Sequence, residues 1–214
     1  MNTNNNYSSI CWLRHDLRLS DNPALLNAIE QGDTLIVYIY DNINSDESTM
    51  MGQASKWWLH HSLTSLDLSL NNRLSIFIGD PQTILAKLCK THKVKNIYWN
   101  RCYEPWIIKR DKNIKKSLQE NGVNVETTNA SLLWEPWEIH KEDQTPYLVF
   151  TPFFKRGCLN ALPPRTPLKA PNLNNAKKSD LSLTINELNL LPKLTWYESF
   201  ENIWDIGEKA AQEK

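Results

Sequence analysis

Short apolar runs rich in β-branched and aromatic residues alternate with longer runs of helical periodicity between residues 10 and 128. Each apolar run has the length of a buried strand, and turn or capping residues separate the runs. The alternation predicts strands at Ile10–Leu13, Leu35–Tyr40, Leu74–Ile78, Ile97–Trp99 and Val123–Thr127. It predicts helices at Ala24–Gln31, Gln53–Leu70, Thr83–Cys89 and Trp106–Glu120.

Strands that alternate with helices form a parallel sheet, because the chain must cross back over the sheet between strands. The predicted fold is therefore α/β, a Rossmann-like, doubly wound, five-stranded parallel sheet with helices on both faces. Ligands bind such sheets beyond the carboxyl ends of the strands, where the strand order reverses. The segments expected at that edge are Arg14–Arg18, Asp41–Gly52 and Asn100–Glu104.

The chain changes character after residue 128. Residues 148–162 are helical in part, with Pro152 as an interruption, and a Pro- and Asn-rich stretch follows. Such stretches commonly connect domains. We therefore expect a disordered N-terminus at 1–9, an α/β domain at 10–162, an interdomain linker at 163–195 and the start of a further domain at 196–214.

Composition narrows the function classes. The formal net charge is zero, whereas a domain that grips nucleic acid by itself usually carries a basic excess. The polar N-terminus has no signal-peptide pattern, and no apolar run is long enough to span a bilayer. The four cysteines are scattered without metal-ligand spacing, so we expect reduced thiols, no metal site and a cytoplasmic protein.

Common catalytic and phosphate-binding signatures are absent from the sequence. It contains no GxGxxG, GxxxxGK[ST], GxSxG or HExxH motif. His60 and His61 are adjacent on a predicted helix, where their side chains point about 100° apart. We interpret them as packing or surface residues.

Six blocks of the sequence occur in the order and spacing of one known family. The first, WLRHDLRLSDNPAL, is the most specific of them. The blocks are Trp12–Leu25, Met51–Leu63, Gly79–Pro81, Trp99–Trp106, Leu133–Glu138 and Pro146–Lys155. With these blocks the chain resembles the N-terminal α/β domain of the photolyase and cryptochrome family over residues 10–160.

The resemblance implies a function that is divided between two domains. Photolyases repair cyclobutane pyrimidine dimers with light. Their α/β domain holds an antenna chromophore, a reduced folate or a deazaflavin. A C-terminal helical domain binds FAD, flips the dimer out of the duplex and performs the electron transfer. We expect this chain to end before that domain, which would be its partner in cis or as a split product and its only route to DNA.

The resemblance and the expected sheet edge together nominate an antenna site. A flat chromophore needs an aromatic or apolar wall and a few placed polar groups. The candidates are Arg14, Tyr38, Met51, Gly52, Lys56, Asn100, Arg101, Glu104 and Trp106. A structural alternative stays open, in which Arg14, Asp16 and Arg18 form ion pairs that hold their loop to the helical domain.

One departure from the family pattern affects the choice of chromophore. Folate-binding members carry an Asn-Glu pair where this chain has Trp106 and Ile107, and Thr49 stands near the position of their folate-binding histidine. This leaves three alternatives open: a deazaflavin, a folate pose that uses Glu104, or no antenna at all.

The resemblance also bears on the nine tryptophans and on activity. The family's tryptophan electron-transfer chain lies in the helical domain, so none of these tryptophans is assigned to it, and Trp134 and Trp137 are expected to pack against that domain. The sequence predicts no catalytic residue and no repair by the chain alone. A stand-alone pterin- or nucleotide-binding module and a non-functional remnant are the alternatives.

Overall fold

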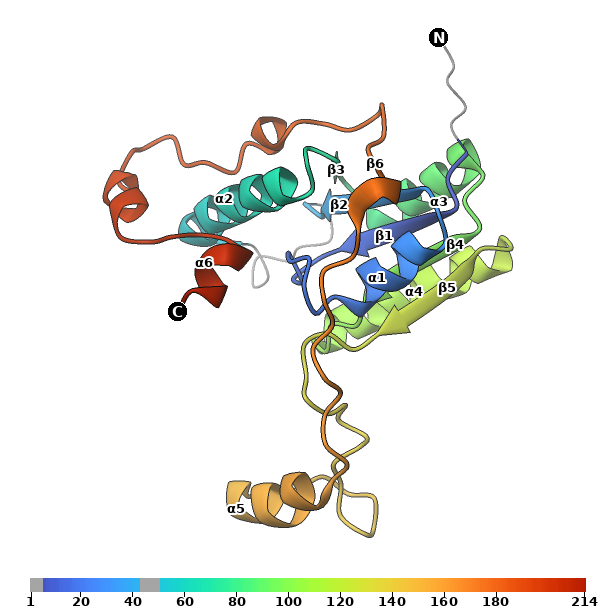
Figure 1. Ribbon diagram of the computed structural model, residues 1–214, viewed down its shortest axis with the longest axis vertical. Coiled ribbons are helices and arrows are strands. Elements are labelled where there is room, and N and C mark those ends of the chain that lie inside the picture. The colour runs from blue at the N-terminus through green and yellow to red at the C-terminus, as the bar shows by residue number, and fades with distance from the viewer. Residues whose placement is uncertain (1–5, 43–50) are drawn as a thin grey trace.

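The computed structural model describes residues 6–42 and 51–214 (Figure 1). Its centre is a parallel sheet in the order β3-β2-β1-β4-β5, so the chain runs outward in one direction and then returns to the other side of β1. The predicted doubly wound sheet is therefore confirmed. Its strands are β1 (Ser9–Leu13), β2 (Thr34–Tyr40), β3 (Leu74–Ile78), β4 (Asn96–Asn100) and β5 (Asn124–Thr128).

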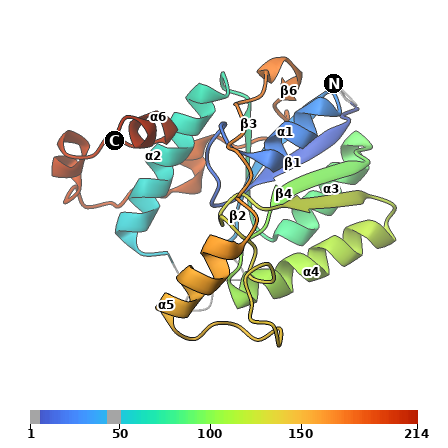
Figure 2. The ribbon, with the colours of Figure 1, turned by 60° about the horizontal axis from the view of Figure 1, so that its bottom comes forward.

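Helices cover both faces of the sheet (Figure 2). Alternate residues of β2 divide between the faces: Ile36 and Tyr38 pack toward one helix pair, and Val37 and Ile39 toward the other. Both faces are dry, which explains why the central strands read as continuous apolar runs. The first pair is α1 (Pro23–Glu30) and α2 (Gln53–Ser69), and the second is α3 (Pro81–His92) and α4 (Pro105–Glu120).

Local capping fixes where α1 begins, just beyond the carboxyl end of β1. The Asn22 side chain accepts a hydrogen bond from the Leu25 amide at 3.1 Å, and Pro23 occupies the first turn, where an amide would have no helical partner. The same Asn22 oxygen accepts a hydrogen bond from Asn100 at 2.7 Å. The start of α1 is therefore tied to the end of β4.

Part of the expected linker belongs to the α/β core. A two-residue strand, β6 (Ala176–Lys177), pairs in parallel with the first residues of β2, and Leu188 and Leu190 are buried in the cluster under α2. Sequence periodicity does not reveal this packing, because its few apolar residues lie in short 3₁₀ turns rather than in a regular element. Those turns are Leu173–Asn175 and Ile185–Leu188.

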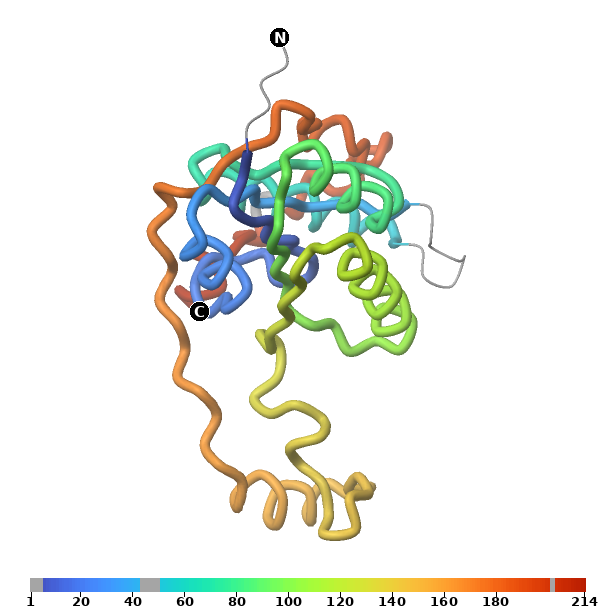
Figure 3. Tube along the Cα trace, turned by 90° about the vertical axis from the view of Figure 1, so that its right-hand side faces the viewer, coloured from blue at the N-terminus to red at the C-terminus, as the bar shows by residue number. Residues whose placement is uncertain are grey.

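Between β5 and β6 the chain extends away from the sheet as an arm, defined here as residues 129–172 (Figures 1 and 3). Its tip is a continuous helical segment, made of α5 (Phe150–Pro152), a π-helical turn (Phe153–Gly157) and a 3₁₀ turn (Cys158–Asn160). Pro152 lies in the first turn of that segment, where a missing amide is tolerated, so it does not interrupt the helix.

The arm is tethered at its base to the β1–α1 loop. Arg18 donates to the Ala130 carbonyl on the outgoing side at 2.6 Å. On the returning side, the Asp21 carboxylate accepts from the Leu168 amide at 3.1 Å and forms an ion pair with Arg165. Arg18 and Asp21 also lie 3.7 Å apart as an ion pair. Both sides of the arm are therefore held by one short loop.

The C-terminal segment returns to α2. Trp57 of α2 packs against Tyr197 and edge-on against Phe200, with ring centroids 6.2 and 5.5 Å away. A 3₁₀ turn (Glu198–Asn202) precedes α6 (Glu208–Gln212). The Glu208 carboxylate accepts from the Leu19 amide at 2.6 Å and the Ser20 amide at 2.8 Å, which fastens α6 to the β1–α1 loop.

The expected disordered N-terminus is too long by at least three residues. Residues 1–5 lie outside the described residues, but Tyr7 is buried against α3 and Ser9 already belongs to β1. The Asn-rich composition of the segment obscured this single aromatic anchor. Among the described residues, none of the helices is both long and apolar enough to cross a membrane.

Candidate ligand pocket

A cavity of about 310 Å³ opens at the carboxyl edge of the sheet, beside the point where the strand order reverses. The loops after β1, β2 and β4 and the first turns of α4 surround it. This is the edge at which the sequence predicted a ligand site. Five of the predicted residues line the cavity: Arg14, Tyr38, Met51, Lys56 and Trp106.

Aromatic and apolar side chains form much of the wall. Trp12 is fully buried and packs edge-on against Trp99, with ring centroids 5.4 Å apart. Tyr38 is also buried, whereas Trp106 at the mouth is 47% exposed. Ile107, next to it, is buried. The wall therefore offers flat surface to a ring while keeping one aromatic side chain accessible from solvent.

Two arginines lie over the indole of Trp12. The guanidinium carbon of Arg14 is 4.9 Å from its ring centroid, and that of Arg110 is 5.3 Å away. Asp111 pairs with both, through an ion pair with Arg14 and a 3.0 Å contact with Arg110. Arg110 also lies 3.5 Å from Asp41. The cationic wall is thus held in place by carboxylates.

Buried donors in this wall lack partners. Nε and Nη2 of Arg14 and Nε1 of Trp12 are buried and have no hydrogen-bond acceptor within the described ranges. Leaving a buried donor unsatisfied costs on the order of 1–3 kcal/mol. A ligand with carbonyl or ring-nitrogen acceptors would remove that cost. Two residues of the cavity lining therefore carry polar hydrogens for which the described residues offer no acceptor.

The other predicted residues lie outside the lining of the cavity. Gly52 is the exposed N-cap of α2. Asn100 is buried; it donates to Asn22 at 2.7 Å and to Asp16, and it accepts from Thr128 at 2.6 Å. Asp16 in turn accepts from the Arg14 amide at 2.8 Å. Asn100 therefore shapes the loop that carries Arg14.

Arg101 and Glu104 are also not among the residues that line the cavity. Arg101 forms an ion pair with Glu135 at the base of the arm and donates to Thr127 at the end of β5. Glu135 accepts from the Tyr103 hydroxyl at 2.7 Å, and burial, followed by this hydrogen bond, raises the pKa of Tyr103 to about 12. Glu104 is the N-cap residue of α4 and lies beside His15.

The structural alternative for Arg14, Asp16 and Arg18 is correct in part. These three residues of the β1–α1 loop do make structural contacts, but hydrogen bonds account for some of them and ion pairs for the others. Asp16 binds the Arg14 amide and Asn100, not a guanidinium. Arg14 pairs with Asp111 of α4. Among these residues, only Arg18 finds its ion-pair partner within the same loop, at Asp21.

A second cavity of about 670 Å³ adjoins the first and shares Arg14, His15, Tyr38 and Met51 with it. It lies between α2 and α6, with Trp58 on one side and Ala211 on the other.

Residues 43–50 of the predicted edge segment, including Thr49, lie outside the described residues.

Sequence reasoning missed several pocket residues, namely Trp12, His15, Tyr40, Cys102 and Arg110. Arg110 could have been found, because it follows Trp106 by four residues on a helix and so shares its face. Its guanidinium carbon lies 5.8 Å from the Trp106 ring centroid. Trp12 gave no such signal, since a tryptophan in a buried strand is usually core.

Comparison with known proteins agrees with this architecture. The family model for DNA photolyase matches residues 9–172. The deoxyribodipyrimidine photo-lyase of Agrobacterium fabrum is 37% identical over 96% of the chain and 43% of its own length. Cryptochrome-1 of Arabidopsis thaliana is 34% identical over 76% of the chain and 24% of its own length.

Solved structures give the same result. A class III photolyase from Agrobacterium tumefaciens superposes with a TM-score of 0.85 at 34% identity, covering 97% of this chain and 43% of that one. A photolyase from Sulfolobus tokodaii that contains two FAD molecules shares the fold, with a TM-score of 0.69 at 24% identity over 86% of this chain and 41% of that one.

The fold and the matched sequence define an N-terminal α/β domain of the photolyase and cryptochrome type. The chain belongs to the DNA photolyase family. It spans about 43% of the length of the Agrobacterium relative.

Proposed function

We propose that this chain is the antenna-binding half of a deoxyribodipyrimidine photolyase, and that it holds a reduced folate or a deazaflavin in the cavity at the sheet edge. The observation that carries the proposal is the set of buried, unpartnered donors on Arg14 and Trp12 inside an aromatic wall. Both chromophore classes are flat rings with acceptors on their edges. When bound, such a group would absorb light and pass the excitation to FAD.

The residues divide into two roles. Arg14 and the indole N–H of Trp12 would donate to ring acceptors, and Trp106, half exposed at the mouth, would cover one ring face. Lys56, from the first turn of α2, would neutralise an anionic tail. Asp111 keeps Arg14 in position without occupying its two remaining nitrogens.

The family's carboxylate-based folate grip is replaced by an apolar surface. Ile107 is buried and offers no acceptor for the amino group of a pterin, and Glu104 lies outside the cavity lining. The charged residues in the cavity lining are Arg14, Arg110, Lys56 and Asp41, so cations outnumber carboxylates there. This composition favours a ring that presents acceptors rather than donors, and it supports a deazaflavin or a folate pose stacked on Trp106.

Light-dependent repair would need the FAD-binding helical domain as a partner, in cis or as a separate chain, and DNA would be reached through that domain. Large apolar side chains are exposed on the arm, among them Trp137, Leu148, Phe150 and Phe154. Monomeric proteins rarely leave such a patch uncovered. We infer that the arm packs against the helical domain, and that the chain by itself has no repair activity.

Titration of the purified chain with a reduced folate and, separately, with a deazaflavin tests the proposal. Fluorescence anisotropy of either compound should show saturable binding, which Arg14→Met weakens by at least about tenfold, as expected for a lost hydrogen bond to a charged group. Lys116→Met, at an exposed position of α4, is the control and should leave affinity unchanged. The antenna role is wrong if neither compound binds, and dimer splitting by the chain alone would contradict the inferred dependence on FAD.

A further inference from the structure

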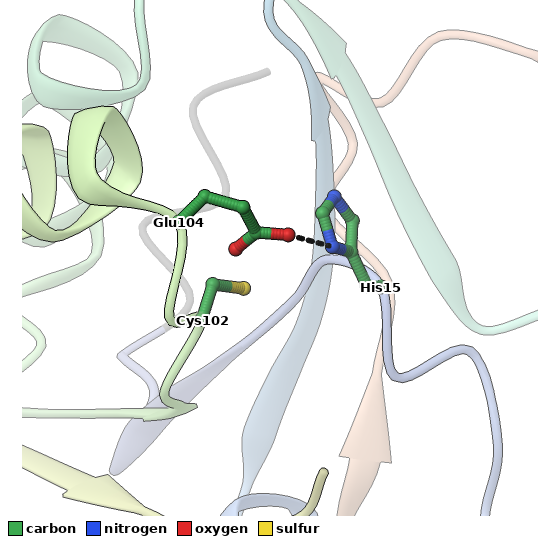
Figure 4. A group of neighbouring side chains, drawn as sticks. All are labelled: His15, Cys102 and Glu104. Atoms are coloured by element: carbon green, nitrogen blue, oxygen red, sulfur yellow. Dashed lines mark ion pairs between the residues drawn. The ribbon is translucent and has the colours of Figure 1, made fainter. Parts of the chain in front are cut away.

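Three side chains with metal-ligating atoms meet at the rim of the pocket (Figure 4). His15 lies two residues beyond the end of β1, whereas Cys102 and Glu104 lie in the loop between β4 and α4. One ligand atom from each, the imidazole nitrogen, the thiol sulfur and a carboxylate oxygen, lies within 4.8 Å of the other two. Because β1 and β4 are adjacent in the sheet, their carboxyl ends bring these loops together.

The spacing is close to that of a tetrahedral cation site. Zinc bonds of about 2.0–2.3 Å place neighbouring ligand atoms roughly 3.3–3.8 Å apart. His15 Nδ1 and Glu104 Oε1 are already 3.7 Å apart. The side chains of His15 and Glu104 are 66% and 46% exposed, so both are free to close the remaining distance by rotation.

The donor set selects the type of cation. One sulfur, one nitrogen and one oxygen suit Zn²⁺ and its neighbours in the first transition row, whereas Mg²⁺ and Ca²⁺ prefer oxygen alone. Three protein ligands leave the fourth tetrahedral position open. Since His15 and Cys102 also line the pocket, that position is accessible from the cavity.

Charges of both signs act on the Cys102 thiol. Burial raises its pKa to about 11, Arg14 lowers it, and Asp111, Asp16 and Glu104 raise it further. A soft divalent cation binds the thiolate form, so its binding would release the thiol proton to solvent.

We propose that His15, Cys102 and Glu104 form a three-ligand site for a zinc-type divalent cation at the mouth of the pocket, with an open fourth position. The proposal does not rest on chromophore binding. No residue pattern indicates this site, because its ligands come from two loops, with His15 and Cys102 87 residues apart, rather than from a spaced motif.

Co²⁺ serves as the probe, because its absorption reports the ligands directly. The purified full-length chain, freed of metal with a chelator, should bind one Co²⁺ with a thiolate-to-cobalt charge-transfer band and the intense visible bands of tetrahedral cobalt. Zn²⁺ should displace it stoichiometrically, and Mg²⁺ should not. Cys102→Ser should abolish the charge-transfer band, and His15→Gln and Glu104→Gln should each weaken Co²⁺ binding by more than about tenfold.

Matched substitutions separate ligation from folding. Cys158→Ser and His140→Gln replace the same residue types on the arm and should leave the titration unchanged, and circular dichroism checks that every variant folds. A wild-type chain without the charge-transfer band overturns the site. So does a band that survives Cys102→Ser, or Co²⁺ affinity that is unchanged in either His15→Gln or Glu104→Gln.

Discussion

Arg14, at the end of β1, forms an ion pair with Asp111 of α4, 97 residues further along the chain. The side chains of both residues are nearly buried, at 6% and 12% exposure. The pair connects the sheet edge to a helix on one face and holds the guanidinium beside the cavity. The position of the pocket's main donor is therefore set by tertiary structure rather than by its own loop.

Replacing Asp111 should destabilise the whole domain. Asp111→Asn leaves Arg14 and Arg110 without their shared carboxylate, and breaking a buried pair costs about 3–5 kcal/mol. Urea unfolding measures the loss. Glu120→Gln, which removes the exposed Lys116–Glu120 pair of the same helix, should change stability by less than about 0.5 kcal/mol. Equal losses in the two variants would refute a special role for Asp111.

The Tyr103–Glu135 contact predicts a measurable alkaline titration. Burial, then the hydrogen bond to Glu135, raises the pKa of Tyr103 from 10.0 to about 12. The folded state holds this proton more tightly, so the associated stability is complete below pH 10 and is lost as the pH rises toward 12. The free energy of unfolding should fall more steeply over that interval in the wild type than in Tyr103→Phe. Parallel slopes would show that the phenol titrates normally.

Glu135→Gln should show how much the Glu135 carboxylate, as distinct from burial, contributes to the raised pKa of Tyr103. The phenolate absorbance assigned to Tyr103, taken as the difference between the parent protein and its Tyr103→Phe variant, should shift to lower pH when Glu135 is replaced. The shift should be partial, since burial remains the larger cause. A midpoint that does not move would exclude the carboxylate as a cause.

The hydrogen bonds that join Glu208 of α6 to the β1–α1 loop, called here the clasp, should slow hydrogen exchange at the amides they involve. Glu208→Ala removes the carboxylate that accepts from the amides of Leu19 and Ser20. Hydrogen bonds to charged groups contribute on the order of 1.5–3 kcal/mol, so exchange at these two amides should accelerate by about tenfold or more. Glu213→Ala, at the C-cap of α6, should leave their rates unchanged. Unaltered rates in the first variant would disprove the clasp.

The arm should contribute to partner binding without stabilising the α/β domain. Phe150 is 73% exposed and Phe154 stacks on it at 5.9 Å, so Phe150→Asp removes little buried surface. Thermal unfolding of the chain should be unaffected, whereas co-purification with a photolyase helical domain should be lost. Leu68→Asp, equally exposed on α2, is the control and should retain the partner. Retention by both variants would place the interface elsewhere.

The sheet was predictable because its signal is local. Leu74–Ile78 is matched residue for residue, and the other four strands differ by one residue at one or both ends. The three central strands, β2, β1 and β4, are buried on both faces, which leaves nearly uninterrupted apolar runs between turn residues. β6 was not predicted, because a strand of only two residues is too short to show the alternation of apolar and polar residues that marks a strand.

The pocket was predictable only in its location. The rule for parallel sheets places a ligand at the carboxyl edge, and Arg14 and Met51 follow from it. Asn100 and Arg101 satisfy the same rule but turn toward buried partners, which no residue pattern reports. Asp111 and Cys102 act through contacts with distant segments, and these exist only once the chain is folded.

The tether of the arm has a mechanical consequence. Arg18 and Asp21 hold the outgoing and returning sides of the arm, and the same loop begins at Arg14 and ends at the cap of α1. The arm and the pocket therefore share one loop. A displacement of the arm relative to the sheet would have to break these contacts or move the backbone that carries Arg14.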